Sequence, residues 1–263
     1  MPYNSEPLSE REYSFTVVTV CFNNADTIRQ TIESVLSQTW KKTEYWVIDG
    51  GSNDGTIEIL KEFGDRVKWI SEPDKGLYYA MNKGWEKASN EYVGFLNADD
   101  FFQHERVVSE FVATVKKNPD TWAVYGDLAY VNPVKTDRIV RYWKAGNYDR
   151  ESFLYGWMPP HPSFYIRKSA FTLFQGFRAE EFNSAADYEF MLRMLYKHRL
   201  PAVYSPGIKV MMRTGGLSNR SLENRLHGNK EDGLAWKING LIPCFYTIWL
   251  KPVRKIFQYL LRP

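Results

Sequence analysis

Two adjacent carboxylates, Asp99 and Asp100, come just after Asn97 at the end of a predicted strand over residues 92–96. Carboxylates at the end of an apolar strand are costly to bury unless they are solvated or bind a cation. Oxygen ligands with room for water and phosphate suit Mg²⁺ or Mn²⁺, and a metal held in this way neutralises a diphosphate. The alternative is a helix N-cap, because an acid before a helix stabilises its first turn.

A glycine-rich turn over residues 49–56 follows a second predicted strand over residues 45–48. Glycines allow a ligand to approach the backbone closely, and the N–H groups at a helix start favour anions. The turn matches neither the dinucleotide-binding pattern nor the P-loop. Asp49 could accept hydrogen bonds from a base or a ribose, but a tight turn capped by an aspartate explains the same residues.

Strands and helices alternate over the first 120 residues of the chain. Apolar runs predict strands over residues 15–22, 45–48, 67–70 and 92–96, and helical spacing predicts helices from residue 28 and over residues 56–63, 77–88 and 107–115. This order predicts parallel βαβ units, in which ligands bind beyond the carboxyl ends of the strands. Three polar clusters, residues 23–24, 49–54 and 97–100, should therefore meet in one crevice.

The alternation is lost after residue 120. Short strands are predicted over residues 122–125, 128–131, 138–143 and 208–212 and at Val203, and an amphipathic helix over residues 185–196. Residues 144–165 are irregular and rich in aromatic side chains. Because there is no linker or internal repeat, we expect one continuous domain followed by a tail.

The charge balance argues against a nucleic-acid partner. The chain of 263 residues carries 34 Lys and Arg against 31 Asp and Glu, a net charge of +3, whereas nucleic-acid binders carry a large basic excess. Two cysteines argue against a disulfide framework. The polar residues 1–14 do not resemble a signal peptide, and no run of about 18 apolar residues occurs. We therefore expect a cytoplasmic protein without a membrane span.

The last part of the chain is basic. Residues 233–263 contain five basic residues and no acid, so the positive balance of the chain comes from this tail. Five apolar residues recur there at helical spacing: Val253, Ile256, Phe257, Leu260 and Leu261. A basic amphipathic helix is typical of proteins that lie on an anionic membrane surface. The alternative is a helix that packs on the domain or on a second subunit.

Four sequence blocks, residues 19–39, 47–56, 71–84 and 94–100, resemble the family 2 glycosyltransferases, which are inverting enzymes of the GT-A fold with nucleotide-sugar donors. The resemblance covers roughly residues 15–101 and continues more weakly through residues 161–164 and 185–189 to about residue 216. It is strongest to the enzymes that build bacterial surface polysaccharides. It implies an α/β fold with a mostly parallel, Rossmann-like sheet flanked by helices, and a C-terminal amphipathic helical tail.

The resemblance also implies an organisation of the chain. A polar segment over residues 1–14 would precede a GT-A domain over residues 15–216. Within this domain, residues 15–120 would bind the nucleotide sugar and residues 121–216 the acceptor. A helical, basic tail over residues 217–263 would follow.

The resemblance implies donor-binding roles for residues of the first half. In relatives the loop after the first strand contacts the nucleoside, which corresponds to Phe22 and Asn23 here. The acid that ends the second strand contacts the base, which corresponds to Asp49. Lys75 borders the donor and would neutralise phosphate charge. Many relatives have a second Asp at the position of Gly50, so this chain would contact the base through one carboxylate.

The family's metal motif is Asp-x-Asp, and its first position here is Asn97. Its last position, the usual direct ligand, is Asp99, and Asp100 is a second candidate ligand beside it. Asn97 can still hydrogen-bond the donor ribose or a metal-bound water. The implied cofactor is Mg²⁺ or Mn²⁺.

The resemblance points to Asp187 as the catalytic base, at the start of a predicted helix. Relatives often have Glu before this residue, where this chain has Ala186. Apart from the family, Asp187 is an acid that the helix dipole favours at this position. Glu189 is the second candidate, although it points to a different helix face. His161, in a loop expected to be exposed, is a candidate contact on the acceptor side.

These expectations form one hypothesis. A peripheral enzyme on the inner face of the cell membrane would move a sugar from a nucleoside diphosphate, by family frequency UDP, to a carbohydrate, in particular a lipid-linked oligosaccharide. Inversion needs one base and one metal site, not the paired carboxylates of a glycoside hydrolase. Five aromatic residues fall where an acceptor groove would lie and suit stacking on sugars: Trp122, Tyr142, Trp143, Tyr155 and Trp157.

Two other functions fit parts of the sequence. A sugar nucleotidyltransferase would also use an α/β sheet, a nucleotide and Mg²⁺, but it would release pyrophosphate. A membrane-associated scaffold could keep the fold without turnover, and the departures at Gly50, Asn97 and Ala186 favour that alternative.

Overall fold

The computed structural model describes residues 12–215 and 222–258. Its first half contains β1 (Phe15–Cys21), α1 (Ile28–Leu36), β2 (Thr43–Asp49), α2 (Thr56–Glu62), the 3-10 turn η1 (Gly64–Arg66), β3 (Lys68–Ser71), α3 (Leu77–Lys87), β4 (Tyr92–Phe95), β5 (Asp100–Phe102) and α4 (Val107–Lys117). The predicted alternation of strands and helices is confirmed. The short strand β5, which begins at Asp100, was not predicted.

The second half contains β6 (Ala123–Val131), β7 (Ile139–Trp143), the 3-10 turns η2 (Arg150–Tyr155) and η3 (His161–Ser163), β8 (Tyr165–Arg167), α5 (Lys168–Phe174), α6 (Ala186–Met191), the π-helical turn η4 (Leu192–Lys197), β9 (Ala202–Arg213), α7 (Leu222–Ile238) and α8 (Thr247–Phe257). Two predictions were wrong here. The strands expected over residues 122–125 and 128–131 form one strand, β6, and those at Val203 and over residues 208–212 form one strand, β9. The pairing register of β6 and β9 shifts on both sides of Asp127, where the sequence suggested a turn.

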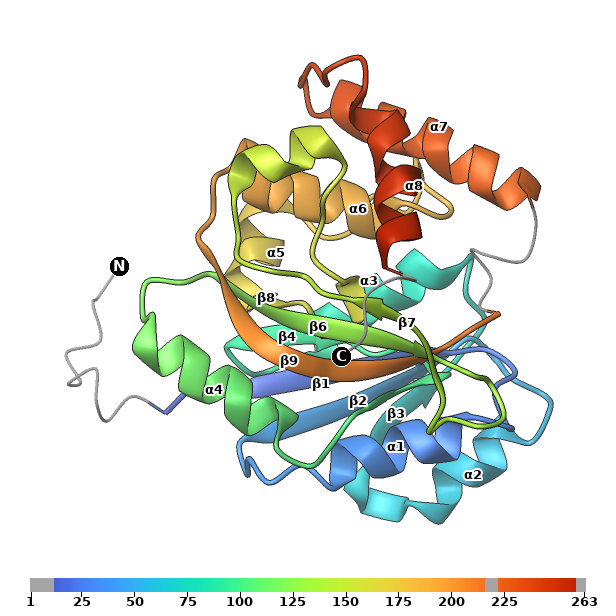
Figure 1. The fold of residues 1–263 in the computed structure, drawn as a ribbon. Helices are drawn as coiled ribbons and strands as arrows, with labels where there is room; N and C mark the ends of the chain where they lie inside the picture. Colours follow the sequence, from blue (N-terminus) through green and yellow to red (C-terminus); the bar gives the residue numbers. More distant parts are fainter. Residues whose placement is uncertain (1–11, 216–221, 259–263) are drawn as a thin grey trace.

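The strands form one mixed sheet between layers of helices (Figure 1). Their order is β3-β2-β1-β4-β8-β6-β9-β5, with β7 paired to β6. Strands β3, β2, β1 and β4 are parallel, as are β6 and β9, whereas β8 runs antiparallel to both β4 and β6. The predicted α/β fold is confirmed, and the carboxyl ends of β1, β2 and β4 lie along the same edge of the sheet.

Two hydrophobic cores lie on opposite faces of the sheet. Phe15 and Val17 of β1 pack in the core with α1 and α4, whereas Val18 and Val20 pack in the core with α3, α5 and α6. All seven residues of β1 are buried. A strand that is covered on both faces has a continuous apolar sequence, which explains why β1 was predicted with nearly its observed bounds.

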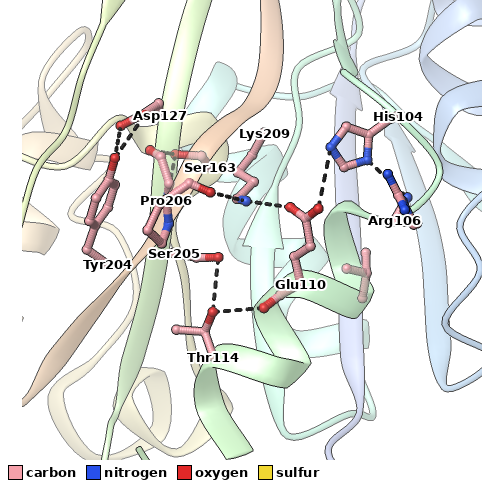
Figure 2. A network of polar contacts seen from close by, with 12 residues as sticks. His104, Arg106, Glu110, Thr114, Asp127, Ser163, Tyr204, Ser205, Pro206 and Lys209 are labelled. Carbon is pink, nitrogen blue, oxygen red and sulfur yellow. Dashed lines mark hydrogen bonds and ion pairs between the residues drawn. The ribbon is translucent and has the colours of Figure 1, made fainter. Parts of the chain in front are cut away.

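Buried polar groups hold the irregular stretch of β6 and β9 together (Figure 2). Lys209 is 1% exposed, and its Nζ lies 2.5 Å from Oε2 of Glu110 on α4 and 2.7 Å from the carbonyl oxygen of Pro206. Asp127 accepts a hydrogen bond from the Tyr204 hydroxyl at 2.8 Å. Because these partners come from distant segments, the local sequence could not show that the two strands continue past Asp127.

Two aromatic residues expected to stack on sugars lie in the interior instead. Trp157 is 5% exposed, and its Nε1 donates to the carbonyl oxygen of Ala145 at 2.9 Å. Tyr142 donates its hydroxyl hydrogen to Asp127 at 2.6 Å. For these two residues the prediction was wrong, because each polar tip has a partner inside the protein.

The helices α7 and α8 pack against the second half of the domain. Trp236 of α7 is fully buried, and its Nε1 donates to the Tyr188 hydroxyl of α6 at 2.9 Å. Thr247, the first residue of α8, donates its hydroxyl hydrogen to the carbonyl oxygen of Leu154 in η2 at 2.7 Å. The side chains of the apolar stripe Val253, Ile256, Phe257, Leu260 and Leu261 lie outside the described residues. In the described parts of the chain, no helix combines the length and the apolar character needed to cross a membrane.

The approach of α3 to the sheet depends on Gly84. A Cβ atom at this position would lie 2.3 Å from Cγ1 of Val18 on β1 and 3.4 Å from Cγ1 of Ile48 on β2. The first distance is far below van der Waals contact, and both neighbours belong to buried strands that have little room to move. Gly84 therefore sets how closely α3 lies on β1 and β2.

We predict that Gly84→Ala destabilises the fold. Overpacking costs about 1–3 kcal/mol, which exceeds the gain of about 1 kcal/mol from replacing glycine by alanine in a helix. The matched control is Gly228→Ala in α7, where the added Cβ would meet its nearest neighbour at 3.9 Å. Thermal unfolding should show a lower Tm for the first variant and an unchanged or higher Tm for the second. Equal Tm shifts would contradict the proposed contact.

Candidate active site

The loops after β1 and β2 are joined by reciprocal hydrogen bonds. The backbone N–H of Asn23 donates to the Ser52 hydroxyl at 2.7 Å, and the backbone N–H of Asn53 donates to Oδ1 of Asn23 at 3.0 Å. Asn23 has φ of 55°, a left-handed conformation that asparagine tolerates better than most residues. The predicted meeting of these two polar clusters is confirmed.

Asp49 ends β2 and is fully buried. One oxygen accepts hydrogen bonds from the backbone N–H groups of Gly51 and Ser52, each at 2.9 Å, and from the Ser71 hydroxyl at 2.6 Å. The other accepts from the Ser52 hydroxyl at 2.5 Å and from the Cys21 thiol at 3.4 Å. Burial alone would raise the pKa of Asp49, but these hydrogen bonds outweigh it and lower the pKa. Asp49 therefore holds the turn in place through these hydrogen bonds, and its side chain is not exposed to solvent.

Two side chains predicted to contact the donor project into solvent beside this turn. Phe22 is 61% exposed and lies over Gly50, where a Cβ would sit 3.4 Å from its ring. Lys75 is exposed just before α3, with its ammonium 6.0 Å from the ring centre of Tyr79. An exposed aromatic face and a nearby cation are what a nucleotide base and its phosphates could meet at this edge.

The carboxylates after β4 differ in their surroundings. Asp99 is half-buried, whereas Asp100 is fully buried. Oδ2 of Asp100 accepts a hydrogen bond from Nδ2 of Asn97 at 3.1 Å, and its Oδ1 is enclosed without a hydrogen-bond partner in the described structure. Burial and the neighbouring charge of Asp99 raise the pKa of Asp100 well above its usual range. Of the two predicted ligands, Asp99 is the one that solvent reaches.

A divalent cation fits this pair of carboxylates. No group of three or more metal-binding side chains occurs among the residues with described positions. Mg²⁺ and Mn²⁺, however, are commonly held by one or two carboxylates together with substrate phosphates and water. The enclosed oxygen of Asp100 and the accessible carboxylate of Asp99 lie on neighbouring residues, and a cation would relieve the repulsion between them.

The turn that carries Asp99 is tied to α1 and to the end of β9. The Thr31 hydroxyl donates to the carbonyl oxygens of Ala98 and Asp100 at 2.9 and 2.6 Å. The guanidinium of Arg213 donates to the carbonyl oxygen of Asp99 and to Oε1 of Gln30. The third polar cluster is thereby joined, through α1, to the loop after β1. Thr31 was not predicted, since only the folded structure brings α1 beside the turn.

Asp187 is held by a tyrosine from the other half of the domain. The Tyr78 hydroxyl, on α3, donates to Oδ1 of Asp187 at 3.1 Å. Burial and the charge of Asp187 raise the pKa of Tyr78 well above its usual range, so the hydroxyl stays protonated and remains a donor. Asp187 is half-buried at the start of α6. Tyr78 was not predicted because this contact spans more than a hundred residues of sequence.

The surroundings of His161 correct the prediction that it is exposed. Its side chain is buried, with the ring stacked on Phe95 at 5.9 Å between centroids and set edge-on to Phe177 at 6.1 Å. Burial lowers the pKa of His161, while the nearby charge of Asp187 opposes that shift. His161 is therefore a buried, neutral imidazole that lies close to Asp187.

Glu189, the second candidate for the base, is fully buried in an ion-pair network. Its carboxylate accepts hydrogen bonds from Nε and Nη2 of Arg193 at 2.8 and 3.0 Å and from Nδ2 of Asn239 at 2.9 Å. Arg178 lies 3.4 Å away. As expected from their positions on the helix, the side chains of Glu189 and Asp187 point in different directions. Glu189 links α6 to α7, whereas Asp187 faces Tyr78.

The chain belongs to glycosyltransferase family 2, since the model of that family matches residues 16–178. An uncharacterized glycosyltransferase of Mycobacterium tuberculosis is 32% identical over 185 residues, which are 68% of this chain and 67% of the relative. A PGL/p-HBAD biosynthesis glycosyltransferase of Mycobacterium bovis is 25% identical over 213 residues, which are 78% of this chain and 79% of the relative.

Solved structures confirm the GT-A fold. S. aureus TarS 1-349 in complex with UDP-GlcNAc superimposes with a TM-score of 0.66 at 14% identity, covering 86% of this chain and 65% of that one. Mannosyltransferase PcManGT from Pyrobaculum calidifontis, in complex with GDP-Man and Mn²⁺, gives a TM-score of 0.65 at 16% identity, covering 99% of this chain and 73% of that one. The chain thus spans about two thirds to three quarters of these two structures.

We predict that Asp49→Asn destabilises the fold by about 1–3 kcal/mol at neutral pH, because an amide cannot accept all the hydrogen bonds made by two carboxylate oxygens. The folded-state pKa of Asp49 is below the ordinary value of 3.8. The stabilisation is therefore complete above that value and is lost as the pH falls through the lower, folded-state pKa. Urea unfolding from about pH 7 to about pH 3 should show the difference between wild type and variant shrinking.

The control for this experiment is Asp65→Asn, which removes the same charge from an exposed position. This variant should unfold like the wild type at neutral pH. A difference between wild type and Asp49→Asn that stays constant across the acid range would contradict the role assigned to the ionised carboxylate.

Proposed function

We propose that this glycosyltransferase moves a sugar from a nucleoside diphosphate to a carbohydrate hydroxyl with inversion at the anomeric carbon. The observation that carries the proposal is the hydrogen bond between Tyr78 and Asp187. It presents one half-buried carboxylate from α6 to a site whose other accessible carboxylate, Asp99, follows β4. A single displacement needs one base and one diphosphate-binding site, on separate elements.

The donor would bind across the loops after β1, β2 and β4. Phe22 would stack on the base, with the backbone around Asn23 and the turn shaped by Asp49 beneath it, and Lys75 would approach the phosphates. Asn97 would hydrogen-bond the ribose or a metal-bound water. UDP is our first choice of nucleotide, supported by the UDP-GlcNAc in the TarS structure, although the archaeal neighbour holds GDP-Man.

Asp99, with Asp100 behind it, would hold Mg²⁺ or Mn²⁺. When bound, such a cation neutralises the charge that develops on the departing diphosphate. The Mn²⁺ in the archaeal neighbour supports this assignment. Arg213, whose guanidinium lies against the Asp99 turn, adds positive charge to the same edge of the sheet.

Asp187 would act as the general base. Its Oδ2 takes the proton of the acceptor hydroxyl while that oxygen forms the bond to the anomeric carbon. The bond from that carbon to the diphosphate oxygen breaks at the same time, and its electron pair leaves with the nucleotide. Tyr78 would hold Oδ1 and fix the orientation of the carboxylate. His161, which is 8% exposed and lies near Asp187, stays our candidate contact on the acceptor side.

The acceptor we propose is a lipid-linked oligosaccharide of surface polysaccharide biosynthesis, met at the inner face of the cell membrane. Residues 15–120 would bind the donor, residues 121–216 the acceptor, and the basic tail over residues 217–263 the membrane. The role of the Mycobacterium bovis relative, which the name assigns to PGL/p-HBAD biosynthesis, supports a biosynthetic acceptor.

We predict that Asp187→Asn abolishes transfer while sparing donor affinity. Loss of a general base costs about 10²–10⁴-fold in rate, and the donor is contacted elsewhere. Tyr78→Phe should lower kcat less, because the carboxylate remains but is no longer oriented. The measurements are release of nucleoside diphosphate with an oligosaccharide acceptor and donor binding by calorimetry. Full turnover by Asp187→Asn would remove this residue as the base, and release of pyrophosphate would identify a nucleotidyltransferase.

We predict that Asp99→Asn weakens donor binding in the presence of Mn²⁺ by at least about tenfold, because one metal ligand loses its charge. Asp120→Asn, which removes an exposed acid after α4, is the matched control and should bind like the wild type. Thermal shift with nucleoside diphosphates, with and without Mn²⁺, gives the readout. If the wild type shows no metal-dependent shift, the chain is a scaffold without the proposed metal chemistry.

A further inference from the structure

Three large apolar side chains project from the turn between α7 and α8 and from the first turn of α8, which carries Trp249. Ile242 is 90% exposed, Phe245 92% and Trp249 74%. We call these three residues the apolar tip. The turn lies at the top of the view in Figure 1, beyond the helix layer and far from α1 and α2. Large apolar groups gathered in this way on a surface mark a place of interaction.

Side-chain contacts attach the backbone next to the apolar tip to the rest of the domain. Asn239, just before the turn, donates to Glu189 of α6 at 2.9 Å, and Thr247, just after it, donates to the carbonyl oxygen of Leu154 at 2.7 Å. Between them the Tyr246 ring stacks on Tyr155 with 5.7 Å between centroids. Because polar side chains and Tyr246 anchor the turn to the domain, its exposed side chains are presented by a defined backbone.

The segment of the chain that carries the apolar tip has charges of one sign. Residues 233–263 contain no acid, and Lys237 and Arg254, before and after the turn, are both exposed. Lys251 is used differently, since its ammonium lies 2.6 Å from Asp232 and 3.8 Å from the ring centre of Tyr188. An apolar wedge flanked by cations complements a surface that is apolar inside and anionic at its boundary.

We propose that the apolar tip inserts into the headgroup region of an anionic lipid bilayer, with Lys237 and Arg254 over the lipid phosphates. This assigns a membrane contact to residues 242–249, ahead of the helical stripe predicted from residue 253 onward. The benefit for catalysis rests on the proposed function. Glu189 lies two residues after Asp187 and contacts Asn239, three residues before Ile242. Docking would thus bring α6, the helix that carries the proposed base Asp187, near a lipid-linked acceptor.

The test is co-sedimentation of the full chain with vesicles of phosphatidylcholine alone and of phosphatidylcholine with phosphatidylglycerol. The wild type should bind the anionic vesicles more tightly, and added salt should weaken that binding. Phe245→Ser combined with Trp249→Ser should weaken binding by at least about tenfold, because two large side chains no longer enter the bilayer. Lys237→Gln combined with Arg254→Gln should remove about tenfold of the preference for anionic lipid.

The matched control is Val134→Ser combined with Leu173→Ser. These residues are 86% and 57% exposed and lie on the β6–β7 connection and on α5, so the control removes exposed apolar surface away from the turn. It should bind vesicles like the wild type. Unchanged thermal unfolding of all variants shows that they are folded.

Three results would overturn the proposal. The wild type could fail to bind either vesicle, or the variant of the apolar tip could bind as tightly as the wild type. Light scattering could instead show a dimer that the same variant converts to a monomer, which would make a second copy the occupant. Vesicle binding needs no turnover, so its failure leaves the proposed transfer reaction standing. A chain that binds vesicles but neither hydrolyses nor transfers from a nucleotide sugar would overturn only the proposed function.

Discussion

Buried carboxylates dictate how the loops at the edge of the sheet are arranged. Asp49, Asp100 and Glu189 are all fully buried, and an uncompensated charge in such a place costs several kcal/mol. Serines and backbone N–H groups satisfy Asp49, and arginine and asparagine satisfy Glu189. Asp100 has one oxygen for which the described structure provides no hydrogen-bond donor. The place where the protein leaves a carboxylate incompletely satisfied is therefore the place where we propose a cation.

The two accessible carboxylates of the site belong to different layers of the fold. Asp99 sits on a turn that α1 and β9 hold in place, whereas Asp187 begins α6 and is oriented from α3. Because α3 packs on the parallel strands through Gly84, the orientation of the proposed base depends on how α3 lies on β1 and β2. Tyr78, which is buried in the core on the α3 side of the sheet, is thus one of the side chains that couple the two halves.

The sequence predicted the parts of the molecule whose local pattern and final environment agree. β1 is buried throughout and mostly apolar because both of its faces are covered, and its bounds were nearly right. β6 was divided in error because Asp127, which suggests a turn, is satisfied by tyrosines from β7 and β9. Within the site, the family resemblance pointed to Asp99 and Asp187, and their roles stay predictions. Periodicity could not show that His161 is buried, or that Tyr78 meets Asp187, because both depend on how distant segments pack.

The dependence of α6 on α7 has a consequence for how the chain folds during its own synthesis. A ribosome delivers residues 183–191 well before Glu231, Trp236 and Asn239, which form hydrogen bonds with Ser184, Tyr188 and Glu189. While the chain is growing, Glu189 has Arg193 beside it but lacks Asn239, and Tyr188 has no indole above it. The parallel strands and their helices can fold during this time, since their partners are close in sequence. Residues 183–191 must wait for α7, so the parallel strands and their helices can form before α6 reaches its final surroundings.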